Sequence, residues 1–252
     1  MALIALMAAS LAAPCSAQST HMMMPEGSTD IHLSLALVNA PDFEGSVRRR
    51  TFVAPLLSAE FANGVFINMN TVGIHLSENP QFDYGVQLAP TRSRVRVHGA
   101  NGWESKSKFT PELGAFLHYK LMQGVQLHAR LTYGGSTDHR GLRMYGGASL
   151  AMPVAEHHAL GMDLGATLAN RSALQADFAV LEGHADAALP LHDAQGGMRD
   201  SHVTAFWVWQ LSTKYTLRTM LRWNRLHGSA AASPRTERAG GTTALTALTY
   251  QF

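Results

Sequence analysis

SHVTAFWVWQL, residues 201–211, is the stretch that decides the fold of this chain. Its side chains alternate between two faces with the period of a β-strand. One face carries Val203, Ala205, Trp207, Trp209 and Leu211, and the other carries His202, Thr204, Phe206, Val208 and Gln210. After a Ser212–Thr213 turn the alternation resumes, with Arg218 and Arg222 on the face opposite Trp223. These residues therefore predict an antiparallel hairpin with one apolar, aromatic face.

The same period of two recurs along most of the chain. It predicts strands near residues 30–39, 51–61, 81–92, 108–120, 124–133, 140–152, 157–169, 199–211, 214–227 and 240–252, with Pro55 interrupting the second. Residues 64–76 form either a short hairpin around Asn68–Thr71 or a connection that does not span. Bacterial single-chain barrels have even strand numbers. We therefore expect an all-β chain that forms an antiparallel up-and-down transmembrane β-barrel of about 12 strands, or 10 in the alternative.

Three features favour a membrane barrel, whose apolar face points outward, over a soluble one. Aromatic residues lie near strand ends, where membrane interfaces have aromatic girdles, as at Tyr84, Tyr119, Tyr133, Tyr215, Trp223, Tyr250 and Phe252. Short and long connections alternate, and the polar faces hold few lysines and glutamates, in a chain with only 15% charged residues. The alternative is a soluble sandwich of two sheets.

The N-terminal segment has the composition of an export signal. Residues 2–13 are almost wholly apolar, and Pro14–Ala17 resembles a cleavage site. We expect residues 1–17 to be a signal peptide, 18–28 a polar leader and 29–252 one outer-membrane barrel domain. Cleavage would remove Cys15, the single cysteine of the chain.

Two connections are predicted to be surface loops. Residues 92–108 are basic and contain glycine, and residues 170–199 form the longest gap between predicted strands. Within this gap, 173–180 is mildly strand-like and 183–197 has the composition of a loop. We expect the segment 170–199 to fold over the outer mouth of the barrel and to narrow its lumen.

The polar residues do not indicate an enzyme, a metal site or a cofactor. Adjacent histidines such as His157 and His158 point to opposite faces of a strand, and no Ser/His/Asp set has recognisable spacing. The net charge of +2 comes from scattered basic residues, which argues against nucleic acid as a partner. Charges opposite the apolar faces are expected to lie in the lumen, either as an internal network or as the lining of a pore: Glu112, His118, Lys120, Arg130, Arg143, Asp163, Arg218 and Arg222.

Three segments resemble the MltA-interacting protein/OmpV family of Gram-negative outer-membrane proteins. They are PDFEGS at 41–46, DFAV at 177–180 and WNRLHGSAAASP at 223–234. Ser229 stands where the family usually has aspartate, and Phe43 and Phe178 where it tends to have tyrosine. The resemblance implies an outer-membrane barrel, and some members act as a scaffold that brings a peptidoglycan (murein) hydrolase together with a synthase.

Two functional classes therefore stay open. In the scaffold hypothesis the barrel is a non-enzymatic anchor in the outer-membrane lipid, and its periplasmic side binds the murein hydrolase and synthase. In the alternative, the barrel is a porin-like channel for small solutes.

Protease treatment of intact cells tests the predicted topology. Cleavage should occur first within residues 170–199 or 92–108, because long loops of such barrels face the outside. Turns such as Ser212–Thr213 should be cut later. The reverse order, mapped by mass spectrometry of the fragments, would mean that the topology is inverted.

Deleting Phe252 tests whether the last strand is an assembly signal. Leu248, Tyr250 and Phe252 alternate up to a terminal aromatic, which resembles the strand that the barrel-assembly machinery recognises. The truncated chain should accumulate in the periplasm and be degraded, while its refolding from urea into detergent stays nearly normal. As a mere lipid contact, Phe252 would contribute roughly 1.5–3 kcal/mol to stability, and insertion in cells would then stay normal.

Overall fold

The chain forms a closed antiparallel barrel of twelve strands. The computed structural model describes residues 24–25, 27–99, 102–135, 140–180 and 189–252, so the predicted signal peptide and most of the leader lie outside the described residues. The strands are β1 (Thr29–Pro41), β2 (Arg49–Phe61), β3 (Val65–Asn68), β4 (Thr71–His75), β5 (Phe82–Gly99), β6 (Gly102–Met122), β7 (Val125–Gly135), β8 (Arg140–Ala155), β9 (His158–Ala169), β10 (Gly197–Gln210), β11 (Tyr215–Leu226) and β12 (Gly240–Gln251). The prediction of twelve strands is confirmed.

The first and last strands close the barrel. β1 pairs with β12 from His32↔Gln251 to Asn39↔Ala244, so that the sheet has no free edge at this junction. Each remaining strand pairs with its neighbours in sequence, which is the up-and-down order. The short β3–β4 hairpin supplies two strands, so the barrel has twelve strands and not the ten of the alternative prediction. Met69 lies in the turn between them with a positive φ of 55°.

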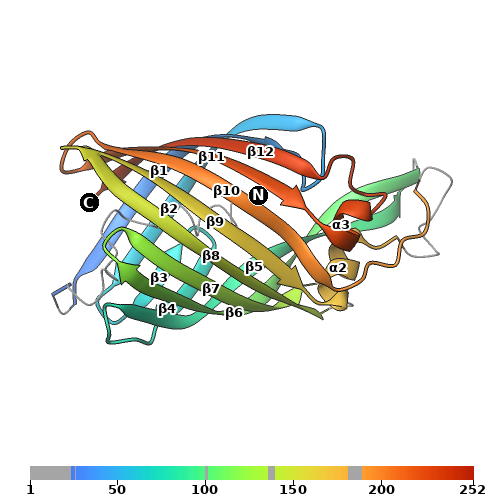
Figure 1. Ribbon diagram of the computed structural model, residues 1–252, viewed down its shortest axis with the longest axis horizontal. Helices are drawn as coiled ribbons and strands as arrows, with labels where there is room; N and C mark the ends of the chain where they lie inside the picture. The colour runs from blue at the N-terminus through green and yellow to red at the C-terminus, as the bar shows by residue number, and fades with distance from the viewer. Residues whose placement is uncertain (1–23, 26, 100–101, 136–139, 181–188) are drawn as a thin grey trace.

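Two predictions about local structure were wrong because they relied on apolar alternation. Residues 92–108 are not a loop, since β5 and β6 stay paired from Arg92↔Phe109 to Gly99↔Gly102. Figure 1 shows this hairpin projecting beyond the end of the barrel at which α2 (Arg171–Phe178) and α3 (Gly228–Ala232) lie. Strands can pair through their backbones without an apolar face where they leave the bilayer. The many arginines, lysines and serines of this segment therefore led to the wrong prediction of a loop.

The segment 173–180 is likewise not strand-like, because residues 171–178 form α2. The Asn170 side chain caps this helix by accepting a hydrogen bond from the Ala173 backbone N–H at 3.0 Å. Ala173, Leu174 and Phe178 are buried, and this spacing places them on one side of a helix. Neither α2 nor α3 is long and apolar enough to cross a membrane, nor is any other helix in the described part of the chain.

The outer surface of the barrel is apolar. In β1, Leu35 and Leu37 are 59% and 53% exposed, whereas Ala36 and Val38, which alternate with them, are 0% and 1% exposed. The same alternation leaves Leu113, Leu131, Met144, Leu164 and Leu221 exposed on other strands. A soluble barrel would bury these side chains and expose the polar ones. The exterior is therefore suited to lipid, and long polar connections stand at the end opposite the C-terminus (Figure 1).

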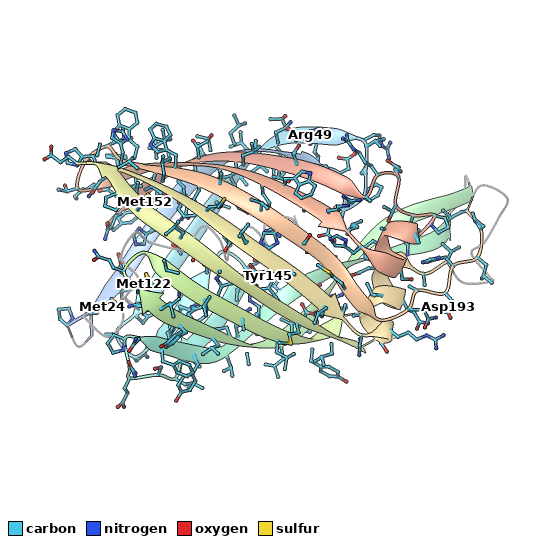
Figure 2. All side chains as sticks on the ribbon, in the orientation of Figure 1. Met24, Arg49, Met122, Tyr145, Met152 and Asp193 are labelled. Carbon is cyan, nitrogen blue, oxygen red and sulfur yellow. The ribbon has the colours of Figure 1, made fainter. Side chains whose placement is uncertain are left out.

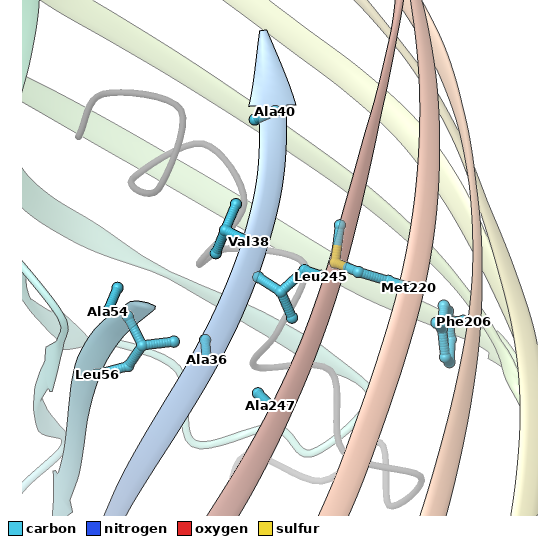
Figure 3. Packing of buried hydrophobic residues seen from close by; sticks show 9 residues of the cluster. All are labelled: Ala36, Val38, Ala40, Ala54, Leu56, Phe206, Met220, Leu245 and Ala247. Atoms are coloured by element: carbon cyan, nitrogen blue, oxygen red, sulfur yellow. The ribbon is translucent and has the colours of Figure 1, made fainter. Parts of the chain in front are cut away.

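Part of the inner wall is also apolar. β10, β11, β12, β1 and β2 contribute a buried cluster, which Figure 3 shows from close by: Ala36, Val38, Ala40, Ala54, Leu56, Phe206, Met220, Leu245 and Ala247. Phe206 lies over Gly161 of the paired strand β9, where a Cβ would come within 2.1 Å of its ring. Gly85 makes the same space for Phe116 of β6, at 2.6 Å. Glycine opposite an inward ring thus lets a narrow barrel contain large side chains.

Replacing Gly161 tests this packing. Gly161→Ala should lower the unfolding midpoint in urea, because the added carbon also meets the Leu150 carbonyl oxygen at 2.6 Å, and overpacking costs ~1–3 kcal/mol. Gly146→Ala is the matched control, since nothing lies within 4 Å of a Cβ there. Equal midpoints for the two refolded variants would contradict a role for Gly161 in seating Phe206.

Candidate functional site

The candidate site is the lumen with the mouth at the α2–α3 end, which we call the outer mouth because the predicted topology places it outside. All eight charges predicted to line the lumen lie on the faces opposite the apolar exterior, and Asp163, Arg218 and Arg222 are each only 7% exposed. The structure brings Glu112 and Arg143 together as an ion pair at 2.5 Å. Asp163 joins a histidine cluster, and His118 joins another. Lys120 lies near the end of β6 and makes no described ion pair.

Asp163 of β9 is the centre of the first cluster. Its two carboxylate oxygens lie 3.0 Å from Nε2 of His202 and 3.2 Å from Nε2 of His128. Tyr145 stands between the two imidazoles, with its ring stacked at 5.6 Å on His202 and at 5.3 Å on His128. Its hydroxyl is 2.9 Å from His128 Nε2 and 3.3 Å from His202 Nε2. Three adjacent strand pairs, β7–β8, β8–β9 and β9–β10, are thereby joined inside the barrel.

Asp83 of β5 is the centre of the second cluster. Its carboxylate is 2.7 Å from Nδ1 of His75 and 3.4 Å from Nδ1 of His118. The His75 ring packs edge-on against Phe116 with centroids 5.3 Å apart, and Phe66 packs against both rings. This cluster fixes the short strand β4 to the long strands β5 and β6.

The outer mouth holds a network of ion pairs. Arg143 of β8 bonds Glu112 of β6 and, at 3.1 Å, Asp177 of α2. Arg199 of β10 pairs with Glu44 from the β1–β2 loop and with Asp200 at 2.6 Å. These contacts tie both α2 and the first loop to the inner wall.

The described parts of the segment between β9 and β10, residues 170–180 and 189–196, lie at this end of the barrel with α3 (Figure 1), and the predicted narrowing of the lumen by this segment stays a prediction. Its buried residues form a small core with α3 and the strand ends: Ala169, Ala173, Leu174, Phe178, Ala179, Ala194, Leu226 and Ala230. Gly141 of β8 permits close approach, because a Cβ there would lie 2.3 Å from Cα of Ala173. Ser233 donates a hydrogen bond to the Phe178 carbonyl at 2.6 Å. We call residues 170–180 and 189–196 the cap.

The outer side of the cap is hydrophilic. Arg171 and Gln175 donate hydrogen bonds to the Asp193 carboxylate at 2.7 and 2.9 Å, and these bonds lower the pKa of Asp193. Figure 2 shows Asp193 at the cap end, and Met122 and Met152 at the opposite end of the barrel. The cap therefore has an apolar side toward the lumen and a charged side toward water.

Sequence reasoning missed several members of these clusters: Glu44, Asp83, Tyr145, Asp177, Arg199, Asp200 and His202. Asp83, Tyr145 and His202 stood opposite apolar residues in predicted strands, so the same alternation could have identified them. Glu44 and Asp177 lie in connections between strands, where no alternation of apolar residues shows which way a side chain points. Their places depend on the fold of the cap and of the first loop.

The clusters bring buried polar side chains together inside the barrel. Among the residues that the structure describes, no three His, Cys, Asp or Glu side chains gather in a way that could hold a metal ion. Nε of Arg130, Nδ1 of His202 and Oγ1 of Thr204 are buried and have no hydrogen-bond partner within this part of the protein. Buried polar atoms of this kind are commonly satisfied by water.

Several solved structures resemble this chain at TM-scores below 0.5. An outer-membrane channel from Pseudomonas putida F1 is 12% identical, with a TM-score of 0.42 over 95% of this chain and 99% of that one. The KdgM porin is 9% identical, with a TM-score of 0.44 over 88% and 99%. The Pseudomonas putida toluene transporter TodX is 10% identical, with a TM-score of 0.39 over 97% and 93%.

No curated protein sequence matches the chain. The family model described as "MltA-interacting protein MipA" matches residues 33–252, which is nearly the whole described barrel. This match agrees with the closed barrel and its apolar exterior. The chain is thus an outer-membrane β-barrel protein that belongs to the MltA-interacting protein MipA family.

Proposed function

We propose that this barrel is a non-enzymatic anchor whose lumen is closed to ions and whose periplasmic side binds a murein hydrolase and a murein synthase. The observation that carries the proposal is the cap over the outer mouth. Arg143 and Arg199 connect the cap and the first loop to the inner wall through Asp177 and Glu44. A cover of this kind over the mouth would obstruct the free diffusion of solutes through a pore.

The energetics of the cap support a stable closure. Its inner side buries Leu174 and Phe178 almost completely, at 1% and 4% exposure. Each buried side chain of this size contributes roughly 1.5–3 kcal/mol. Arg143 and Asp177 are both largely shielded from water, so their ion pair is screened little by salt. The cap therefore stays in place unless a ligand or partner displaces it.

The periplasmic side is suited to a flat protein contact. The turns there are short, as at Gln123–Gly124, Glu156–His157 and Leu211–Lys214. Aromatic rings surround this end, including the stack of His158 on Trp207 and the contact of Tyr250 with Phe252. The family description, MltA-interacting protein, supports a partner of this kind.

One observation favours a channel as the second candidate. The inner wall carries Arg130 Nε and His202 Nδ1 without described hydrogen-bond partners, which indicates a lumen that takes up water. In this alternative the cap is a gate rather than a closure.

Conductance and enzyme binding together distinguish the two candidates. Wild-type protein refolded into planar bilayers should show no stable conductance. Replacing residues 172–195 by a short Gly-Ser linker should produce open channels, because the mouth loses its cover. In nanodiscs, both proteins should bind purified murein hydrolase equally, since the cap lies at the opposite end from the periplasmic turns.

Shortening the β5–β6 hairpin is the control for loop deletion, because the hairpin projects beyond the barrel at the same end as the cap (Figure 1). This variant should stay closed. Steady conductance by the wild-type barrel would overturn the closed-lumen proposal. Failure of every form to bind the hydrolase and the synthase would overturn the scaffold role.

A further inference from the structure

A cavity lies at the outer mouth between the first loop and the inner wall. Its empty volume is about 490 Å³, part of which opens to solvent, and sites for small molecules have a similar size. The polar side chains that line it come from the first loop and from β10, β11 and β12: Glu44, Ser46, Asp200, Arg222, Asn224 and Thr243. The cavity therefore adjoins the ion-pair network of the mouth, to which Glu44 and Asp200 belong.

The first loop is held beside this space by the connection between β11 and β12. The Arg238 N–H donates a hydrogen bond to the Gly45 carbonyl at 2.9 Å. The Glu237 carboxylate accepts a hydrogen bond from the Val47 N–H at 2.8 Å. These bonds fix one side of the cavity, so a ligand would meet a preformed site.

Gly241 of β12 leaves part of the space empty. A Cβ at this position would lie 3.2 Å from Oδ1 of Asn224 and 3.5 Å from Cγ of Pro41, and both of these residues line the cavity. A larger side chain at position 241 would therefore enter the cavity. The room for a ligand depends on this glycine.

Arg222 of β11 brings a positive charge into the cavity. It is 7% exposed, and within the described part of the chain its side chain makes no hydrogen bond and no ion pair. The residues paired with it on β10 and β12 are the uncharged Thr204 and Thr243. A buried guanidinium is costly unless an anion or water bonds it. The Arg222 guanidinium is therefore available to a ligand.

The end of the cavity nearer the mouth carries negative charge. Asp200 and Glu44 share the guanidinium of Arg199, whose Nη1 lies 2.6 Å from Asp200 Oδ2. Asp200 Oδ1 accepts a further hydrogen bond from Thr167 at 3.2 Å. A carboxylate has about four lone-pair sites, so both groups can accept more hydrogen bonds. Because two carboxylates share one guanidinium, negative charge remains in excess at this end.

The register of the strands keeps the two charges apart. Arg222 pairs with Thr204, which is four residues from Asp200 along β10, or ~13 Å. Asn224 lies between these two levels and also lines the cavity. The Arg222 side chain shortens the gap, but no ion pair joins it to Glu44 or Asp200 among the residues that the structure describes. The cavity is therefore positive at one end, neutral in the middle and negative at the other.

We propose that this cavity binds a small zwitterion of the class of α-amino acids and short peptides. The ligand carboxylate accepts paired hydrogen bonds from Arg222, and its ammonium group donates to Glu44 or Asp200. The Asn224 amide bonds the polar groups between them. A simple anion would be repelled by the two carboxylates, and a simple cation by Arg222. The site lies at the opposite end from the periplasmic turns, so it does not depend on the scaffold role.

Titration calorimetry on the wild-type barrel, refolded in detergent, tests the choice of ligand. Glycine and glycylglycine are the probes, and at least one of them should bind with a millimolar or lower Kd. Acetate and ethylammonium should each bind at least about tenfold more weakly, because each lacks one of the two charged contacts. Failure of both zwitterions to bind would mean that the cavity holds water only, and would overturn the proposal. Equal binding of acetate would overturn the assignment of a zwitterion.

Two substitutions locate the binding. Arg222→Met keeps the length of the side chain but removes its charge, and should weaken binding at least about tenfold. Arg225→Met is the matched control on the exposed face of the same strand and should bind as the wild type does.

Gly241→Val changes no charge and should also abolish binding, because its added carbons occupy the cavity. The heat-dependent gel mobility of each variant shows whether the barrel has folded, and the comparison of ligands on the wild type requires no variant. Wild-type affinity in folded Arg222→Met or Gly241→Val would overturn the site.

Discussion

Inside a bilayer, every backbone N–H and C=O must find its partner within the protein. This constraint explains the closure of β1 on β12 and the twelve-stranded ladder. The hydrogen-bonded ladder satisfies the backbone, and the outward side chains contact lipid. Apolar side chains therefore point outward and polar ones inward, which is the reverse of a soluble barrel. The described ladder stops short at more than one place, among them the edges of β2 and β5 beyond the β3–β4 hairpin and the edge of β6 beyond Glu112. At the first of these, Pro55 does not interrupt β2, contrary to the sequence prediction, because its missing N–H faces no partner strand, and Pro90 stands at the equivalent place in β5.

The interior follows from the same inversion. Side chains excluded from lipid meet inside a narrow barrel, where buried charges need partners. Asp83 and Asp163 each hold two histidines, and Arg143 and Arg199 hold carboxylates from the cap and the first loop. The polar clusters lie on the strands from β4 to β10, while the apolar cluster lies on β10, β11, β12, β1 and β2. The inner wall is therefore mainly polar on one side and mainly apolar on the other, although β11 also carries the buried Arg218 and Arg222.

Much of this could be predicted from alternation alone. The faces of Ser201–Leu211 were assigned correctly, because successive side chains of this strand point alternately to the lipid and to the lumen. Alternation failed where that contrast is absent. Residues 92–108 are rich in arginine, lysine and serine, and their apolar alternation is limited to Val95 and Val97. The helix α2 depends on the local Asn170 cap and also on close packing against Gly141, which is a tertiary contact. The partners of Asp163 lie on strands far apart in sequence, so their meeting required the register of the sheet.

The central claim is that the odd-numbered residues of β10 face lipid and the even-numbered ones face the lumen. Spin labels on single cysteines, placed in turn at residues 202–207 of the barrel in vesicles, measure this directly through collision with oxygen, which concentrates in the hydrocarbon. Accessibility should peak at Val203, Ala205 and Trp207 and fall at His202, Thr204 and Phe206. Peaks at the even positions, or no period of two, would contradict the account.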